Sequence, residues 1–250
     1  MRPAARRGVR LANAPLADFQ KFELGRRVIY LRRDMASQAP AIVASLSQLD
    51  ARSGTGNRSS GLPLKLQDGT ELFARLGRRG GLTRLLLRDL YLGLRARPVR
   101  ELEVSAAARR RGIAVAEPIG AMIEWVAPVL YRSIFLTRAL PGMTLWEFLC
   151  TDDDTLVRAY VIQQGRQAID TMHQNGLFHA DLNLHNLFVT QIHEKFAVAI
   201  LDLDKAQLFP GPVPARMRAQ NFARLRRSAG KLDPNRLYLD SHLLERLTHI

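Results

Sequence analysis

The chain has 250 residues, of which 47% are hydrophobic, and that is enough for a sizeable core in one or two compact units. The single cysteine, Cys150, excludes an intramolecular disulfide framework. We expect no transmembrane helix, because no apolar run reaches about 18 residues, and no signal peptide, because no apolar stretch follows the basic residues 1–10. The net charge of +14 favours an acidic partner, such as nucleic acid, anionic lipid or a phosphorylated substrate, although a general preference for arginine would give the same charge.

The first 138 residues are predicted to be mostly sheet with one prominent helix. Residues 1–20 are expected to be loosely attached. A Gln-Asp-Gly turn at 67–69 joins two apolar runs, which is a hairpin signal. The predicted strands cover 27–31, 62–66, 70–76, 119–126 and 133–137, and the predicted helices cover 41–49 and 99–111.

The rest of the chain is predicted to be mostly helical. Apolar residues recur at helical spacing from Leu156 to Asn175, and Asn175-Gly176 is a natural helix end. A basic amphipathic helix is expected at 221–228; its arginines could face an anionic membrane or simply solvent. The sequence therefore predicts two parts, a sheet lobe at 1–138 and a helical lobe at 139–250.

Between these helices lies His179-Ala-Asp181-Leu-Asn183-Leu-His185-Asn186, which fits the pattern H-x-D-x-x-x-x-N. This is the catalytic-loop pattern of protein-kinase-like phosphotransferases, in which the Asp orients a hydroxyl and accepts its proton. The Asn, five positions later, holds a magnesium ion that bridges the phosphates of ATP. The pattern makes Asp181 the candidate catalytic residue and Asn186 a candidate metal ligand. We interpret His179 as a residue that braces the loop, as the histidine of kinase catalytic loops does, and the histidines lack the spacing of a zinc site.

A second carboxylate follows the loop at the end of a predicted hairpin. The apolar runs 187–189 and 196–201 form its strands, and the second run ends at Asp202-Leu203-Asp204. In kinases the aspartate of the D-F-G motif follows such a hairpin and binds magnesium. Asp202 is therefore the second candidate metal ligand.

Three further parts of a nucleotide site can be assigned in the sheet lobe. Arg75 is the basic residue of the strand that should face the phosphates, and Glu101 is our choice for its helix partner, with Glu103 in reserve. Arg75 could also be a solvated strand residue, and either glutamate could be a surface carboxylate. Gly54 and Gly56 could form the phosphate-covering loop, or only a flexible turn.

Taken together, these motifs resemble those of the lipopolysaccharide core kinases that act on 3-deoxy-D-manno-octulosonic acid (Kdo). The likeness rests on five blocks, and it covers most of the chain from about residue 50. Leu203 replaces the usual Phe, and Leu76-Gly77 stands where aromatic or His residues are usual. The blocks are Arg78-Arg79-Gly80-Gly81-Leu82, Val99-Arg100-Glu101, the segment from Arg111-Gly112 to Pro118, His179 to Asn186, and Asp202-Leu203-Asp204-Lys205.

The resemblance implies an α+β, protein-kinase-like two-lobe fold with an antiparallel sheet lobe and a reduced helical lobe. It implies transfer of the ATP γ-phosphate, with Mg²⁺, to the 4-hydroxyl of Kdo on a lipid A precursor. The expected location is the cytoplasmic face of the bacterial inner membrane, on its anionic surface; a nucleic-acid partner is not expected. The implied site comprises Asp181 for catalysis, Asn186 and Asp202 for the metal, and Arg75, Glu101, Gly54 and Gly56 for ATP.

Two rival functions stay open. Catalytic motifs alone do not separate a Kdo kinase from a kinase for heptose or for another small acceptor such as an aminoglycoside. A non-catalytic, basic binding module on a kinase fold is the rival from a different class, and the intact Asp181, Asn186 and Asp202 argue against it. A protein kinase is disfavoured, because few residues follow Asp204 to build a peptide-docking lobe.

Overall fold

The computed structural model describes residues 16–52, 61–77, 91–92, 96–193 and 195–249. These residues divide into two compact units. Unit 1 takes its described residues from 107–116 and 140–249, and unit 2 takes them from 16–106 and 117–139. Each unit therefore combines segments that are separated in the sequence.

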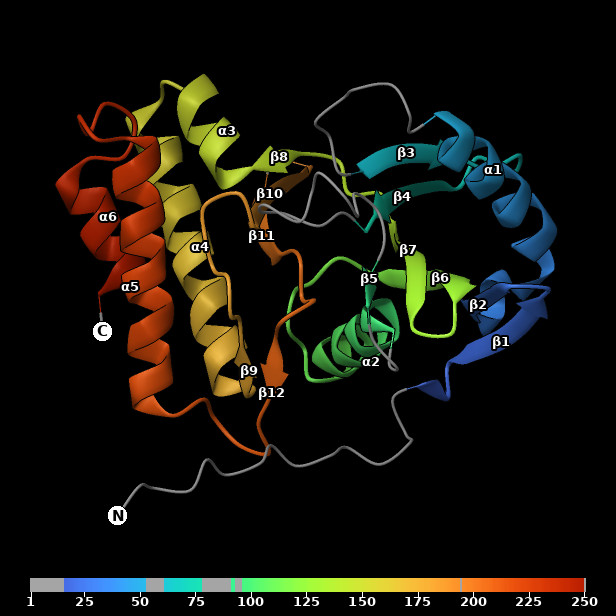
Figure 1. Ribbon diagram of the computed structural model, residues 1–250. Helices are drawn as coiled ribbons and strands as arrows, with labels where there is room; N and C mark the ends of the chain where they lie inside the picture. Colours follow the sequence, from blue (N-terminus) through green and yellow to red (C-terminus); the bar gives the residue numbers. More distant parts are fainter. Residues whose placement is uncertain (1–15, 53–60, 78–90, 93–95, 194, 250) are drawn as a thin grey trace, which may run out of the picture. The chain divides into compact units, whose positions relative to one another are not determined.

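Unit 2 is built on an antiparallel sheet whose strands follow the order β1-β2-β6-β7-β4-β3, with β5 paired to β7 (Figure 1). The pairs β1–β2, β3–β4 and β6–β7 join strands that are consecutive in the chain, whereas β2–β6, β4–β7 and β5–β7 join strands that are separated in it. The strands are β1 (Phe19–Leu24), β2 (Arg27–Arg32), β3 (Gly61–Lys65), β4 (Glu71–Leu76), β5 (Tyr91–Leu92), β6 (Pro118–Ala127) and β7 (Leu130–Arg138).

Alternation along the strands gives this sheet two apolar faces. On β4, Leu72 and Ala74 are fully buried in a cluster with Ile42 and Leu46 of α1 (Ala39–Arg52), which follows the 3₁₀ helix η2 (Arg33–Gln38). On the opposite face of the sheet, Phe135 of β7 packs in a cluster with Leu102 of α2 (Arg97–Arg110). A helix on each face removes both apolar surfaces from water.

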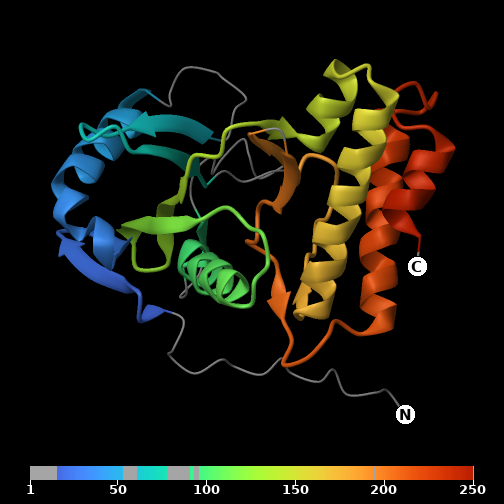
Figure 2. The same cartoon turned by 180° about the vertical axis from the view of Figure 1, so that it is seen from behind.

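Unit 1 combines helices with a small sheet. The helices α4, α5 and α6 lie side by side, as Figure 2 shows from behind. The hairpin β10–β11 pairs with β8, and β9 pairs with β12. The elements are β8 (Met143–Thr144), α3 (Leu145–Thr151), α4 (Thr155–Gln174), β9 (Leu177–Phe178), β10 (Leu187–Ile192), β11 (Lys195–Ile200), β12 (Gln207–Leu208), α5 (Ala215–Leu232) and α6 (Ser241–Thr248).

Side-chain caps explain where several of these helices begin. Thr144 and Glu147 form a reciprocal capping box at α3, and the Asp154 carboxylate accepts the N–H of Leu156 at 2.8 Å at the start of α4. The carboxylate of Asp240 accepts the N–H of Leu243 at 2.8 Å and begins α6. These caps satisfy backbone N–H groups that a helix leaves without partners.

The segment 107–116 is tied to unit 1 by backbone and side-chain bonds. The N–H of Ile200 donates to the Ala114 oxygen at 2.8 Å, and Val115 forms a parallel bridge with Ile200. The Arg111 guanidinium donates to the carbonyl oxygens of Asn175 at 3.0 Å and Phe209 at 2.7 Å. This segment therefore holds one end of β11.

The α+β class predicted from the sequence is confirmed, and every strand and helix predicted within the described residues is present with shifted ends. The expectation of a loosely attached stretch up to residue 20 is wrong for Phe19 and Gln20. Both lie in β1, because Phe19 is buried against the α2 face of the sheet. The predicted glycine loop with Gly54 and Gly56, and the block at 78–82, lie outside the described residues.

Candidate active site

The catalytic-loop residues 179–186 lie between β9 and β10 in unit 1. The chain enters this loop from α4 through Gly176, whose φ of +79° lies in the left-handed region. A Cβ there would lie 2.6 Å from the Gly211 oxygen and 2.7 Å from the Phe209 oxygen. Only glycine fits, because both the backbone angle and the close approach exclude a side chain.

Asn183 organises the loop. Its Oδ1 accepts the N–H groups of His185 at 2.9 Å and Asn186 at 3.2 Å, and its Nδ2 donates to the Asp181 oxygen at 2.9 Å. The Nδ2 of Asn186 donates to the same Asp181 oxygen at 2.9 Å. These bonds hold Asp181 and Asn186 in one tight turn.

The two candidate side chains have the chemistry that their predicted roles need. The Asp181 carboxylate is exposed, and no hydrogen bond to it is found within the described part of the chain. Because Asn186 uses its Nδ2 as a donor, its Oδ1 is the atom left to bind a cation. Asp181 can therefore accept a proton from a hydroxyl, and Asn186 can offer an oxygen ligand.

The imidazole of His179 links the loop to the end of β11. The ring is 1% exposed, its Nδ1 accepts the N–H of Asp181 at 3.1 Å, and its Nε2 donates to the Leu201 oxygen at 2.9 Å. These partners require the neutral ring with its proton on Nε2. Burial lowers the pKa of His179, which keeps the ring in this form.

Asp202 follows Leu201 directly and has an unusual backbone. Its φ is +58°, a left-handed conformation that aspartate tolerates better than most residues. The N–H of Leu201 donates to the Asn186 oxygen at 2.9 Å, so the segments that carry Asn186 and Asp202 are bonded to each other. Leu203, at the position of the kinase Phe, is buried. Backbone strain of this kind concentrates at functional sites.

Asn186 and Asp202 supply hard oxygen donors, which suit magnesium. Among the described residues no group of three or more His, Cys, Asp or Glu side chains could hold a metal ion by itself. A magnesium site of one or two protein ligands, completed by phosphate and water, needs no such group. The donor set of unit 1 therefore fits this ion.

The predicted pair Arg75–Glu101 is present in unit 2. The Arg75 Nη2 bonds to both carboxylate oxygens of Glu101, and the two side chains are 27% and 5% exposed. Arg75 also lies over the Phe135 ring, with its guanidinium carbon 5.7 Å from the ring centre. The pair forms because Arg75 lies on the sheet face that α2 covers, opposite Phe135 in the β4–β7 register. Glu101, rather than Glu103, makes this contact.

His179 contacts the loop as the sequence predicted, whereas the other residues that support the loop were not predicted. Asn183 acts as the turn organiser, although it stands where many kinases have Lys. His173 and Asn221 form a buried pair behind the loop. The sequence feature that could have indicated this pair is Asn221, because asparagine is unfavourable in the apolar face of a helix.

Comparisons with known proteins agree with the chemistry of this site. Residues 54–241 match the family model described as the lipopolysaccharide kinase (Kdo/WaaP) family. A "3-deoxy-D-manno-octulosonic acid kinase" from Xylella fastidiosa is 33% identical over 177 residues, which cover 68% of this chain and 67% of that protein. One with the same description from Actinobacillus succinogenes is 29% identical over 153 residues, covering 60% of this chain and 62% of that protein.

A solved structure, "WaaP in complex with acyl carrier protein", has a TM-score of 0.47 and 17% sequence identity to this chain. The match covers 77% of this chain and 76% of that chain. The alignments to the two kinases above span about two thirds or less of each relative's length.

Proposed function

The chain belongs to the lipopolysaccharide kinase (Kdo/WaaP) family, and we propose that it transfers the γ-phosphoryl group of ATP to a hydroxyl of Kdo. The proposed acceptor is Kdo attached to a lipid A precursor, and the proposed position is the 4-hydroxyl. The observation that carries this proposal is that the His179 ring bonds to both the Asp181 N–H and the oxygen of Leu201, the residue before Asp202.

In the proposed reaction Asp181 orients the acceptor hydroxyl and accepts its proton as the phosphoryl group is transferred. Asn186 and Asp202 would hold Mg²⁺, which when bound neutralises charge on the phosphates. Arg75, oriented by Glu101, contributes a fixed positive charge for ATP. We infer that residues 1–138 cover the nucleotide, with Gly54 and Gly56 against its phosphates.

The first test uses γ-labelled ATP and Mg²⁺ with a Kdo-bearing lipid A precursor, beside the same lipid without Kdo. We expect label only in the Kdo-bearing lipid, and mapping of the product would then identify the hydroxyl. Label in both lipids would overturn Kdo as the acceptor. Label in neither, with ATP still bound, would direct the search to heptose-bearing cores and to the non-catalytic alternative.

Asp181→Ala should abolish labelling while leaving ATP binding intact, because the carboxylate acts on the acceptor. Asp153→Ala is the matched control, since its side chain is fully exposed on unit 1. Full activity of the Asp181 variant would exclude the assigned base.

We further propose that the protein acts at the cytoplasmic face of the bacterial inner membrane. Within the described residues, no helix has both the length and the apolar character to cross a membrane.

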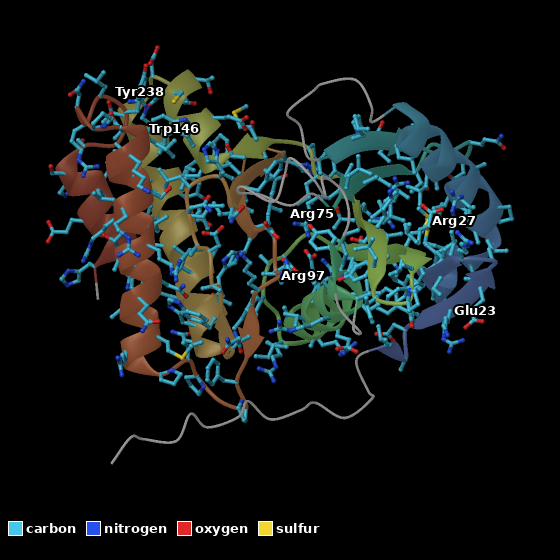
Figure 3. All side chains as sticks on the ribbon, viewed as in Figure 1. Glu23, Arg27, Arg75, Arg97, Trp146 and Tyr238 are labelled. Atoms are coloured by element: carbon cyan, nitrogen blue, oxygen red, sulfur yellow. The ribbon has the colours of Figure 1, made fainter. Side chains whose placement is uncertain are left out.

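Helix α5 contains no acidic residue, and the turn after it exposes Leu237 by 70% and Tyr238 by 37%. Tyr238 packs edge-on against Trp146 of α3, with ring centres 5.8 Å apart (Figure 3). Exposed basic residues of α5 are Arg216, Arg218, Arg224, Arg226, Arg227 and Lys231.

Basic side chains beside exposed apolar and aromatic residues suit an anionic lipid surface. The protein should therefore sediment with vesicles that contain anionic lipid, and salt should weaken the binding. Leu237→Ser with Tyr238→Ser should reduce it, whereas Leu156→Ser should not, although Leu156 is 81% exposed on α4. Equal binding to neutral vesicles, or no difference between these variants, would contradict the surface.

A further inference from the structure

Asn221 is a polar residue in the middle of α5 whose side chain is completely removed from solvent. It shares the buried face of the helix with Phe222, Leu225 and Ala229. A buried amide without partners is costly, and asparagine is a poor residue for a helix interior. Its presence therefore needs bonds that an apolar residue could not make.

Asn221 makes two such bonds, one on each side of its amide. Its Nδ2 donates to the backbone oxygen of His179, and its Oδ1 lies 3.0 Å from the Nε2 of His173 on α4. Since the His179 oxygen can only accept, the orientation of the amide is fixed, and His173 must carry its proton on Nε2. The Nδ1 of His173 is buried and has no hydrogen-bond partner among the described residues.

His173 is itself held firmly. Its side chain is 1% exposed and its ring packs edge-on against Phe222, with ring centres 5.4 Å apart. Its backbone oxygen accepts the N–H of Val213 at 2.8 Å. The ring is therefore a fixed point from which Asn221 is oriented.

These contacts form a polar chain, which runs from the His173 ring through the Asn221 amide to the backbone of His179. His179 then holds the Asp181 N–H and the Leu201 oxygen with its own ring. We propose that Asn221 and His173 are positioning residues, which set the place of the Asp181 carboxylate through His179. This inference rests on the proposed function of Asp181 and extends it to two buried residues of α4 and α5.

The reason to expect a kinetic effect is the short path between the pair and the reacting atoms. Only His179 separates the Asn221 amide from the N–H of Asp181. A displacement of about 1 Å at a reacting group can cost on the order of 100-fold in rate. Neither Asn221 nor His173 needs to touch ATP for this effect to occur.

The test compares variants that keep or remove single bonds. Asn221→Asp keeps the shape and the acceptor but loses the donor to His179, and Asn221→Leu loses both bonds. His173→Gln keeps a donor at similar reach, whereas His173→Leu removes it. Leu225→Ala is the control, because Leu225 is equally buried on α5 and its side chain has no polar atom.

We expect both Asn221 variants and His173→Leu to lower kcat by about 10- to 100-fold while the KM for ATP stays within about twofold. His173→Gln should stay within about threefold of the parent kcat, because it preserves the donor to Asn221. Leu225→Ala should lower Tm and leave kcat unchanged at temperatures well below its transition.

Hydrogen exchange of the Asp181 amide, measured in the peptide that contains residues 179–186, gives a second readout that needs no acceptor substrate. Exchange should be faster in the Asn221 variants and unchanged in Leu225→Ala. If the parent protein labels no lipid, the proposed function fails, yet the exchange data still decide the role of Asn221.

Two results would overturn the proposal. One is parental kcat and parental exchange in Asn221→Asp. The other is an equal fall of kcat in Leu225→Ala, which would assign the loss to general destabilisation. Should the Asn221 variants fail to fold, the comparison of His173→Gln with His173→Leu carries the decision.

Discussion

The ring of His179 reaches the backbone oxygen of Leu201 at 2.9 Å across 22 positions of the sequence. The same ring accepts the N–H of Asp181, so one buried imidazole connects the candidate catalytic base to the residue before the candidate metal ligand Asp202. A single side chain thus sets the spacing between two parts of the site.

His179→Phe should fill the same space without these bonds. It leaves the Asp181 N–H and the Leu201 oxygen without their partner, which we expect to cost about 1–3 kcal/mol of stability. The kcat should fall by about 10- to 100-fold through displacement of Asp181. Steady-state kinetics and urea unfolding measure the two effects, with the exposed His242→Phe as control. A parental kcat in His179→Phe would show that the ring does not position the base.

Arg75→Met should remove the guanidinium that bonds to both oxygens of the buried Glu101 carboxylate. Removal of one member of a buried pair typically costs about 3–5 kcal/mol, whereas Arg75→Met with Glu101→Leu should cost less than Arg75→Met alone. If Arg75 contacts the phosphates, ATP affinity should fall in both proteins.

The pair Arg27–Glu124 provides the control for Arg75, because it is also an ion pair on the sheet of unit 2. Arg27 and Arg75 are both labelled in Figure 3. The Arg27 and Glu124 side chains are 29% and 22% exposed, so Arg27→Met should change stability by about 1 kcal/mol or less and leave ATP affinity alone. Equal loss of ATP affinity in the two arginine variants, measured by nucleotide titration, would remove Arg75 from the nucleotide site.

Stability should fall as the solution is made more acidic than about pH 6.5. Burial lowers the pKa of His173 and of His179 below the ordinary value of 6.5, although the bond to Asn221 opposes this in part for His173. Both rings are neutral in either state at higher pH. Below pH 6.5 the unfolded chain takes up protons that the folded rings exclude, so unfolding is favoured.

Urea unfolding between pH 5 and pH 8 measures this dependence. His173→Gln removes one of the two groups and should make the acid-side slope shallower than in the parent. A parental slope in His173→Gln, with two-state unfolding at every pH, would show that His173 contributes no linked proton.

Asp233 should stabilise the turn that exposes Leu237 and Tyr238. Its carboxylate accepts the N–H groups of Leu237 at 2.8 Å, Tyr238 at 2.9 Å and Leu239 at 2.8 Å. Burial tends to raise the pKa of Asp233, but these three bonds outweigh it and the net pKa is lowered. The stabilisation is therefore present above the unfolded pKa and is lost as pH falls through the lower, folded value.

Asp233→Ala should cost about 1–3 kcal/mol and weaken binding to anionic vesicles, because the turn loses its acceptor. Thermal unfolding and vesicle sedimentation measure the two effects, and the exposed Asp153→Ala is again the control. Undiminished vesicle binding in a folded Asp233→Ala would separate the turn from the membrane surface.

The candidate loop 179–186 could be singled out from the sequence because its pattern lies within eight consecutive residues. The resemblance to lipopolysaccharide core kinases is confirmed by the match over 54–241. The long helices were predictable from apolar spacing, since α4 buries Val161, Ile162, Ile169 and Met172 along one side.

The elements that were missed have weak local signals. In β1 only Phe19 is buried, so the strand lacks apolar alternation and forms by pairing with β2. Helix α6 is eight residues long, although Asp240 and the spacing of Leu243 and Leu247 would have indicated it. The partners of Asn221 could not be predicted from the sequence, because they are 42 and 48 positions away.

The segment 107–116 affects how the protein folds during synthesis and whether its two units can be produced separately. During synthesis Arg111 leaves the ribosome well before Asn175 and Phe209, the two residues whose oxygens it binds. Unit 1 therefore cannot close until most of the chain has been translated, although unit 2 can begin to pair its strands earlier. Because each unit is interrupted by a piece of the other, no single cut in the gene would yield the two units as separate proteins.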